Sequence, residues 1–438
     1  MTSISRSVIK NFCIYSAGTI ALKLITAGTT FLVIRLLTPQ QYGLLALLNT
    51  LVAVIPILLS LGLRQAFGVE YVHLTSAQRK QMVNDLCILY LTISTPLLLV
   101  LLANTRLLNS MLFTNNAPPG ALTITLLTCF ISFFAELFLQ ALRYQCRART
   151  LTFVQLGAAL ATMCCTLLCI YILRLHILGV ILGQLVGQLA IALYGWRLYH
   201  QRVGVYAHDI LRAPGRTRYY FKLGLPFIPS IIFSWIITAG DRWVLANLGT
   251  LHDVGIYALA DTFGQLFNAI VLQALIASYI PSMLRRFAQN PDDILVTDAY
   301  NHRLMWLCMI VTSVIITAGY LVARPMLGWA LPPKYHPALG YIWAILMSAI
   351  PLMGSYFATC YLQFFKKTYL LVALTTGASL VNIALDALLI PYLHITGAIA
   401  ATGIAYSLYL CAILMITSHY KRRHADALAH LQHAQWHY

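Results

Sequence analysis

The sequence predicts an all-α integral membrane protein with about twelve transmembrane helices in two six-helix lobes. Three observations lead to this fold class. Only 9% of the 438 residues are charged and 60% are hydrophobic, whereas a soluble domain carries roughly 25% charged residues. About a dozen apolar runs approach the ~20 residues that cross a bilayer. Lysines and arginines between these runs fall mostly on alternate connections.

The spans follow one another with short connections. The first run begins after Asn11 and is too long for a signal-peptide core, so we expect it to remain as a span. The approximate bounds of the predicted spans are 11–34, 43–63, 83–104, 120–142, 151–173, 177–198, 220–246, 253–279, 303–323, 338–362, 368–390 and 395–417.

The basic residues predict the orientation of the chain. Of the 29 Lys and Arg, two lie inside predicted spans, Lys23 and Arg242. One face receives only five, namely Arg35, Arg106, Arg174, Arg324 and Lys334, and the other face receives the remainder. By the positive-inside rule both termini are cytoplasmic, and we expect a multi-pass protein of a bacterial inner membrane. Topology therefore accounts for the net charge of +17, and no nucleic-acid partner is expected.

An internal repeat predicts the domain organisation. At an offset of 212 residues, the segment from Ile25 to Thr50 matches Ile237 to Thr262 and pairs Thr38 with Thr250. At an offset of 218, His176 matches His394. Parallel six-span repeats enclose a cleft in membrane transporters. The predicted parts are an N-terminal lobe at 1–198, a basic cytoplasmic linker at 199–219, a C-terminal lobe at 220–417 and a cytoplasmic tail at 418–438.

Ionisable residues inside spans indicate a polar interior. Each costs roughly 2.5–3.5 kcal/mol at the bilayer centre, so it should face a cavity or a partner. The six candidates are Lys23, Glu136, Asp241, Arg242, Asp261 and Asp386. Stripes of Ser and Thr beside them are also typical of helix packing, and an acid near a span end has the alternative of reaching interfacial water. The ten cysteines include no CxxC and no Cys/His ligand spacing, so no metal site or cofactor is predicted.

Several segments resemble the polysaccharide flippases of the multidrug/oligosaccharidyl-lipid/polysaccharide exporter superfamily. These are RLLTPQQYGLLAL at 35–47, GLPFIPS at 224–230, DRWVL at 241–245, VGIYALA at 254–260 and VNIALDALLIPYLHITGAIAATGIA at 381–405. The resemblance implies a V-shaped pair of six-helix lobes. It also implies export of an isoprenoid-diphosphate-linked oligosaccharide for O-antigen, lipopolysaccharide or exopolysaccharide biosynthesis, by ion-coupled alternating access.

This resemblance assigns roles to the charged residues. A diphosphate needs cationic partners, and the candidates are Lys23, Arg35, Arg64 and Arg242. Acids are natural carriers of a coupling H⁺ or Na⁺, and the candidates are Glu136, Asp241, Asp261 and Asp386. The expected partners are the lipid-linked oligosaccharide, the coupling ion, membrane lipids and a polysaccharide polymerase.

Two alternatives stay open. One is a multidrug or small-solute cation antiporter of the same superfamily, although the first two spans hold Lys23 and no carboxylate. The other is a membrane polysaccharide polymerase or ligase, whose chemistry generally sits in a large outer loop. Here the longest outer connections, Thr105 to Pro119 and Ala323 to Pro337, contain no Asp or Glu. A non-enzymatic transporter is therefore favoured, without catalytic residues.

Overall fold

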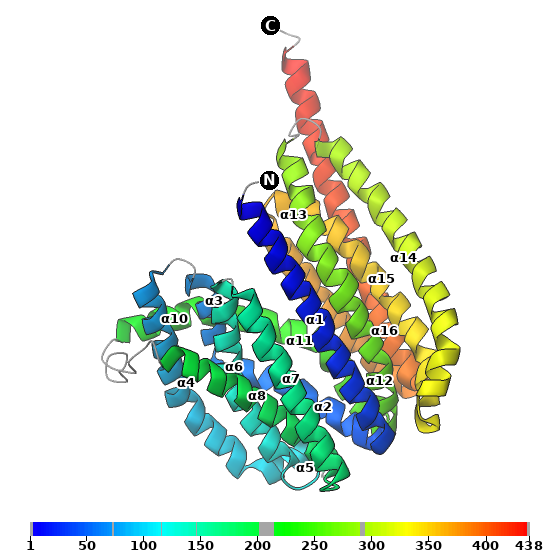
Figure 1. Ribbon diagram of the computed structural model, residues 1–438. Helices are drawn as coiled ribbons and strands as arrows, with labels where there is room; N and C mark the ends of the chain where they lie inside the picture. The colour runs from blue at the N-terminus through cyan, green and yellow to red at the C-terminus, as the bar shows by residue number, and fades with distance from the viewer. Residues whose placement is uncertain are drawn as a thin grey trace. The chain divides into compact units, whose positions relative to one another are not determined.

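The computed structural model describes residues 3–71, 74–114, 116–145, 147–200, 214–289 and 294–435, so most of the predicted linker lies outside the described residues. Every regular element in these ranges is a helix (Figure 1), which confirms the predicted fold class. Ten helices of the described ranges are long and apolar enough to cross a membrane. An eleventh span is present if the bent pair Gly215–Phe233 and Thr238–Leu248 counts as one. The chain forms two compact units, unit 1 (Met1–Trp235) and unit 2 (Ile236–Tyr438).

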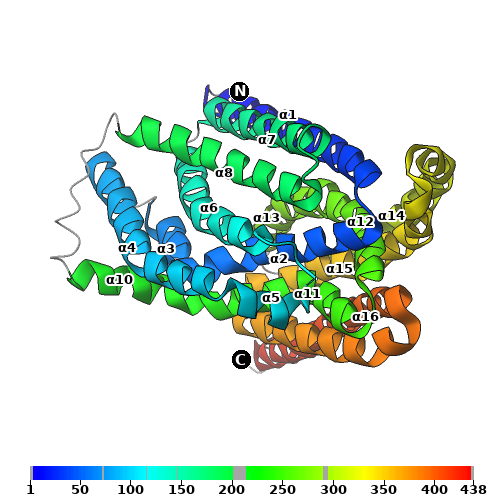
Figure 2. The ribbon, with the colours of Figure 1, turned by 90° about the horizontal axis from the view of Figure 1, so that it is seen from below.

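Unit 1 is built from long helices and three shorter ones. α7 packs against α1 and α8, and α6 packs against α2 and α8 (Figure 2). The outer connection predicted at Thr105 to Pro119 is partly helical, because it contains α5. The helices are α1 (Ser3–Leu36), α2 (Pro39–Ser60), α3 (Leu63–Glu70), α4 (Ser76–Ala103), α5 (Thr105–Phe113), α6 (Ala121–Tyr144), α7 (Ala148–Tyr171), α8 (His176–His200), α10 (Pro214–Gly224) and the first part of α11 (Ile228–Leu248).

Unit 2 is centred on α15, which packs against α12, α14 and α16. α12 continues into α13 through the π-helical turn Asn268–Leu272. The predicted span 253–279 is therefore part of a longer helical segment that ends at Gln289. Such turns often accompany functional sites. Besides the end of α11, the helices are α12 (Leu251–Phe267), α13 (Gln273–Gln289), α14 (Ile294–Ala330), α15 (His336–Phe364) and α16 (Thr368–Gln435).

α16 contains two of the predicted spans, 368–390 and 395–417. Its backbone breaks at His394, where φ is 47°. Eight residues of a straight helix extend about 12 Å. However, the backbones of Leu389 and Gly397 lie so close that a Cβ on Gly397 would come within 2.7 Å of the Leu389 carbonyl. The chain therefore reverses at this break, and only glycine fits at position 397 without displacing the neighbouring backbone.

Residues paired by the sequence repeat have the same local roles in the two units. Thr38 caps the start of α2, where its hydroxyl accepts the N–H of Gln41 at 3.3 Å. Thr250 caps the start of α12 and accepts the N–H of Asp253 at 3.1 Å. The hydroxyl in each case satisfies an N–H that the helix itself leaves unpaired. The second pair agrees as well, because His176 and His394 both have left-handed φ values, 44° and 47°.

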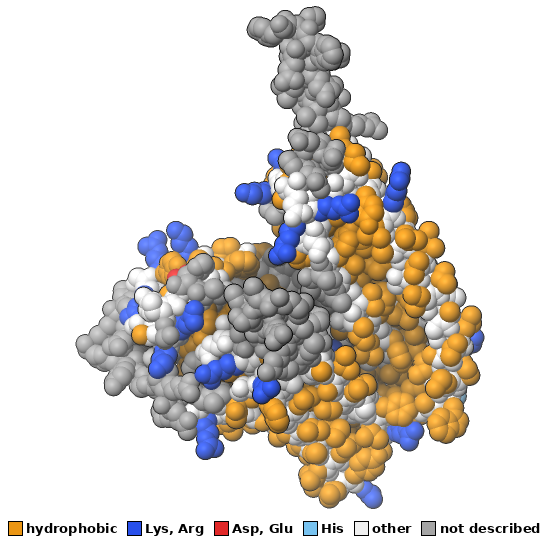
Figure 3. Space-filling model, turned by 45° about the horizontal axis from the view of Figure 1, so that its top comes forward, with side chains coloured by type: hydrophobic (Ala, Val, Ile, Leu, Met, Phe, Trp, Pro, Cys, Tyr) orange, Lys and Arg blue, Asp and Glu red, His pale blue; other side chains and the backbone are white. Residues whose placement is uncertain are grey.

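The outer surface of the described helices is apolar. Figure 3 shows a broad, continuous hydrophobic surface, and on α14 the side chains of Ile310, Val314 and Leu321 are more than half exposed. A soluble monomer rarely exposes so large an apolar patch. Lipid is the solvent that such a surface requires, so the chain is a multi-pass membrane protein.

Each unit also holds a buried aspartate that the sequence analysis did not single out. Asp85 of α4 pairs with Arg216 of α10, with 3.1 Å between carboxylate and guanidinium. Asp298 of α14 pairs with Lys421 of α16 and lies 3.1 Å from Nδ1 of His302. The two carboxylates are 1% and 0% exposed. In each unit, therefore, a buried acid on the third long helix pairs with a basic residue that comes after the sixth helix of the repeat. This ion pair holds the two segments together.

We expect Asp298→Asn to destabilise unit 2 by about 3 kcal/mol or more, because it leaves the Lys421 ammonium without its ionic partner. Denaturant unfolding in detergent measures the loss. Adding Lys421→Met should recover most of it, since the unpaired charge is then removed. Equal stability of Asp298→Asn and the wild type would show that this pair does not hold the two helices together.

Candidate functional site

Four of the charged residues predicted inside the membrane gather in unit 2. Asp241 and Arg242 lie on α11, Asp261 lies on α12 and Asp386 lies on α16. Tyr257, Asp261 and Gln265 are spaced four residues apart, so they occupy one face of α12. Asn382 and Asp386 are likewise one turn apart on α16. We call these seven residues the acidic site.

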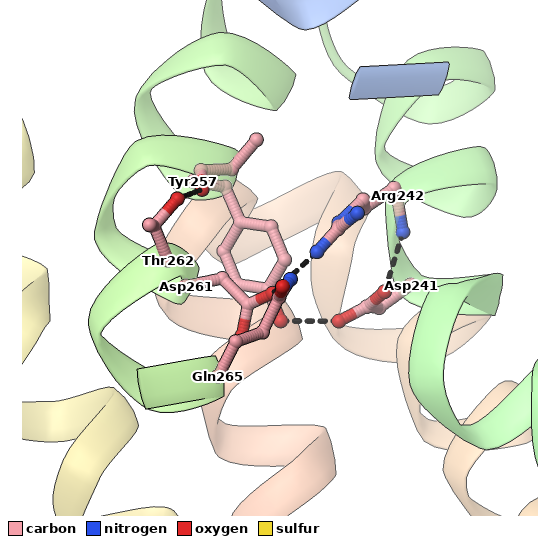
Figure 4. Close-up of polar contacts among 7 residues, drawn as sticks. Asp241, Arg242, Tyr257, Asp261, Thr262 and Gln265 are labelled. Atoms are coloured by element: carbon pink, nitrogen blue, oxygen red, sulfur yellow. Dashed lines mark hydrogen bonds and ion pairs between the residues drawn. The ribbon is translucent and has the colours of Figure 1, made fainter. Parts of the chain in front are cut away.

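Asp241 is buried, with 6% of its surface exposed. The Tyr257 hydroxyl donates a hydrogen bond to its Oδ2 (Figure 4). The backbone N–H of Arg242 donates to its Oδ1 at 2.8 Å. The carboxylate therefore has neutral partners, and it does not pair with the side chain of its sequence neighbour Arg242.

Arg242 pairs instead with Asp261 of α12, also drawn in Figure 4. The residue is 8% exposed, and its Nε has no hydrogen-bond partner among the described residues. Gln265 donates from Nε2 to the same Asp261 oxygen at 2.9 Å. One guanidinium and one amide thus hold Asp261, so the Arg242–Asp261 pair links α11 to α12.

Of the three carboxylates in the acidic site, that of Asp386 has the fewest compensating contacts. It is fully buried, and neither carboxylate oxygen has a hydrogen-bond partner among the described residues. Asn382 lies one turn away and is 3% exposed. Neither the nitrogen nor the oxygen of its side-chain amide has a hydrogen-bond partner among the described residues. The charge of Asp241 lies close enough to repel that of Asp386. Such polar groups are costly to bury unless something binds them.

The charges in the acidic site do not balance. Three carboxylates, those of Asp241, Asp261 and Asp386, accompany one guanidinium, that of Arg242. If all ionise, two negative charges remain uncompensated in a low-dielectric region. A proton or a monovalent cation would relieve this repulsion. In the described part of the chain, no three His, Cys, Asp or Glu gather as ligands of a metal ion.

The structure places the other predicted residues in unit 1. Lys23 is half-buried on α1, without a carboxylate at ion-pair distance among the described residues. Arg35 is exposed at the end of α1, with its guanidinium 5.0 Å from the Phe31 ring centre. Arg64 is half-buried on α3. Glu136 of α6 lines a cavity of unit 1, so it is not part of the acidic site.

Three residues of the acidic site were not predicted as site residues, namely Tyr257, Gln265 and Asn382. Tyr257 precedes Asp261 by four positions and so shares its helix face. This four-residue spacing is the sequence signal that could have identified Tyr257. Tyr406 of α16 also lies within electrostatic reach of Asp241 and Asp261, but its position on a distant part of the sequence gave no comparable indication.

Comparisons with known proteins agree with this architecture. The family model described as "Polysaccharide biosynthesis protein" matches residues 8–287. No curated protein matches the chain in sequence. An inward-facing multidrug resistance MATE family transporter of the MOP superfamily has a TM-score of 0.69 at 13% identity, covering 93% of this chain and 95% of that chain.

Two other solved structures are similar. The lipid II flippase MurJ, in an inward closed conformation, has a TM-score of 0.67 at 14% identity, covering 93% of this chain and 87% of that chain. A MOP superfamily transporter from Pyrococcus furiosus has a TM-score of 0.56 at 12% identity, covering 97% and 96%. The fold is therefore that of the MOP superfamily, and the chain belongs to the polysaccharide biosynthesis protein family.

Proposed function

We propose that this protein flips an isoprenoid-diphosphate-linked oligosaccharide across the bacterial inner membrane for surface polysaccharide biosynthesis. Membership of the polysaccharide biosynthesis family supports the substrate class. The similar fold of MurJ, named as a lipid II flippase, supports movement of a lipid-linked sugar. Both termini are proposed to be cytoplasmic, as the distribution of basic residues predicts.

The acidic site is the proposed route of the coupling ion. The observation that carries this step is the burial of Asp386 and Asn382 with no hydrogen-bond partner for their side chains among the described residues. A dehydrated Na⁺ would gain oxygen ligands from both side chains, and a proton would neutralise the carboxylate directly. Either ion would reduce the repulsion between Asp386 and Asp241. Loading and release of the ion would then drive alternating access.

We assign the binding of the diphosphate to the basic residues. Lys23, Arg64 and Arg35 of unit 1 are proposed to hold the phosphate oxygens at different points of the crossing, because phosphate favours charge-assisted hydrogen bonds. Arg242 pairs with Asp261 in this structure. Its contact with a diphosphate would therefore require this pair to open, which would tie substrate binding to the state of the acidic site.

A deletion strain tests the proposal. Without the protein, we expect the sugar-lipid precursor to accumulate on the cytoplasmic side and the surface polysaccharide to be lost. Plasmid-borne wild-type protein should restore both, whereas Lys23→Ala should restore less. Precursor found on the outer side of the deletion strain would overturn the assignment, because the flipping step would then not depend on this chain.

A multidrug antiporter is the second candidate, favoured by the MATE transporters among the structural relatives. It predicts that the deletion strain becomes more sensitive to cationic drugs while its surface polysaccharide stays normal. Measuring drug sensitivity and polysaccharide in the same strain separates the two functions.

A further inference from the structure

Unit 1 contains a second polar site, separate from the residues proposed for ion coupling. It is a cavity of about 420 Å³ among α1, α2, α6, α7 and α8. This volume lies within the range of small-molecule pockets, roughly 300–1,000 Å³. Among the described residues that line it, Glu136 is the sole charged one.

Carboxamides dominate the polar lining. They belong to Asn49 of α2, Gln155 of α7, and Gln184 and Gln188 of α8. Gln184 donates from Nε2 to Oδ1 of Asn49 at 2.9 Å, which fixes the orientation of both groups. The side chains of Gln155, Gln188 and Glu136 make no hydrogen bond to another described residue. The cavity therefore offers both amide donors and carbonyl or carboxylate acceptors.

Threonines add hydroxyl groups to this lining. The hydroxyls of Thr26 and Thr29 donate to α1 carbonyl oxygens at 2.9 and 2.8 Å, so their oxygens remain available as acceptors. Thr166 of α7 is fully buried and lines the cavity, yet its hydroxyl has no partner among the described residues. A buried, unpartnered hydroxyl facing a cavity indicates a missing hydrogen-bond partner.

Small residues lie beside this cavity, where α8 packs closely against α7. Gly187 of α8 lines the cavity, and a Cβ there would overlap the Thr162 hydroxyl of α7. Gly183 likewise lies against Thr166. Close approach of helices through glycine is common in membranes. On α7, Ala158 and Ala159 line the cavity with short side chains.

The mixture of groups points to a hydroxyl-rich, uncharged ligand. An anion such as a diphosphate would meet the Glu136 carboxylate and no basic side chain of the lining. A dehydrated cation prefers several oxygen ligands that converge at about 2.0–2.6 Å. This cavity is far wider than such a site, and the NH₂ group of each carboxamide is a donor that does not bind a cation. Sugar hydroxyls both donate and accept hydrogen bonds, so they can bond to amides, to threonine hydroxyls and to a carboxylate.

We propose that this cavity, the saccharide pocket, binds a neutral sugar residue of the lipid-linked substrate. Glu136 accepts hydrogen bonds from two sugar hydroxyls, and the carboxamides of α7 and α8 contact the remaining ones. The inference rests on the proposed flippase function. It also gives Glu136 a different role from the ion coupling that the sequence analysis assigned to it.

Sugar binding to the purified full-length protein in nanodiscs tests the proposal. The probes are maltose, N,N′-diacetylchitobiose and the methyl glycosides of glucose, galactose and rhamnose, detected by saturation-transfer NMR. Ala159→Trp fills the pocket. Leu160→Trp is the matched control, because Leu160 is the next residue of α7, is 45% exposed and does not line the cavity.

We expect at least one probe to bind the wild type and Leu160→Trp, and Ala159→Trp to weaken that binding at least tenfold. Glu136→Gln should weaken it by about tenfold, because charge-assisted hydrogen bonds are lost. Failure of all probes to bind the wild type would overturn the inference, as would normal binding by Ala159→Trp. Loss of ion uptake with normal sugar binding in Glu136→Gln would identify an ion site instead. Displacement of the sugar by tetraphenylphosphonium would identify a cationic-drug site.

A parallel assay of lipid-linked saccharide flipping distinguishes failure of this inference from failure of the proposed function. If Ala159→Trp flips the substrate normally, the saccharide pocket is wrong and the flippase assignment stands. If the wild type binds sugar in the pocket but flips no lipid-linked saccharide, the flippase assignment is wrong.

Discussion

Asp386→Asn is expected to abolish ion-driven flipping while the protein remains folded. Asparagine keeps the shape of the side chain but cannot release a proton or neutralise a cation. We expect a fall in gradient-driven rate on the order of 10²-fold, the scale of a lost positioned proton carrier. The fold should survive because Asp386 has no hydrogen-bond partner to lose among the described residues. The charge repulsion from Asp241 is also removed.

Proteoliposomes with an imposed H⁺ or Na⁺ gradient provide the measurement. Asp253→Asn is a suitable control, because this acid lies in the first turn of α12, outside the acidic site, where its carboxylate accepts the hydroxyl of the capping residue Thr250 at 2.8 Å. It should flip at the wild-type rate. An undiminished gradient-driven rate in Asp386→Asn would exclude this carboxylate as the ion carrier.

Arg242→Ala should have the second large effect, on both stability and transport. Its removal leaves Asp261 without its ionic partner and removes the one guanidinium of the acidic site. Breaking a buried pair in this way costs about 3–5 kcal/mol. Arg242→Lys should recover only part of the loss, since an ammonium has a different geometry from a guanidinium.

The double variant Arg242→Ala/Asp261→Ala separates the two effects. Denaturant unfolding should show most of the stability restored, because no unpaired charge remains on that side of the site. Transport should stay low if Arg242 also contacts the diphosphate. A stable Arg242→Ala single variant would contradict the role of the pair in linking α11 to α12.

Much of the fold could be predicted from local sequence. Hydropathy located the long helices, because an apolar run has few alternatives to crossing a membrane. The repeat paired Thr38 with Thr250, and both cap the second helix of their unit. The helical segment α5 was missed, since a short amphipathic helix leaves little signal in an average over twenty residues.

The candidate site was predictable only in part. The cost of burying charge identified Asp241, Arg242, Asp261 and Asp386, which the structure brings together in unit 2. Which side chain pairs with which was not predictable, because Tyr257 and Asp261 reach α11 only through tertiary packing. The saccharide pocket was equally hidden, since Asn49 and Gln184 are 135 residues apart.

Reconstituted flipping of a fluorescent isoprenoid-diphosphate-linked oligosaccharide tests the central claim most directly. In proteoliposomes, the wild type should transfer the lipid across the bilayer faster when an H⁺ or Na⁺ gradient is imposed, and Asp241→Asn should lose this acceleration. A rate equal to that of protein-free liposomes, with or without the gradient, would contradict the account.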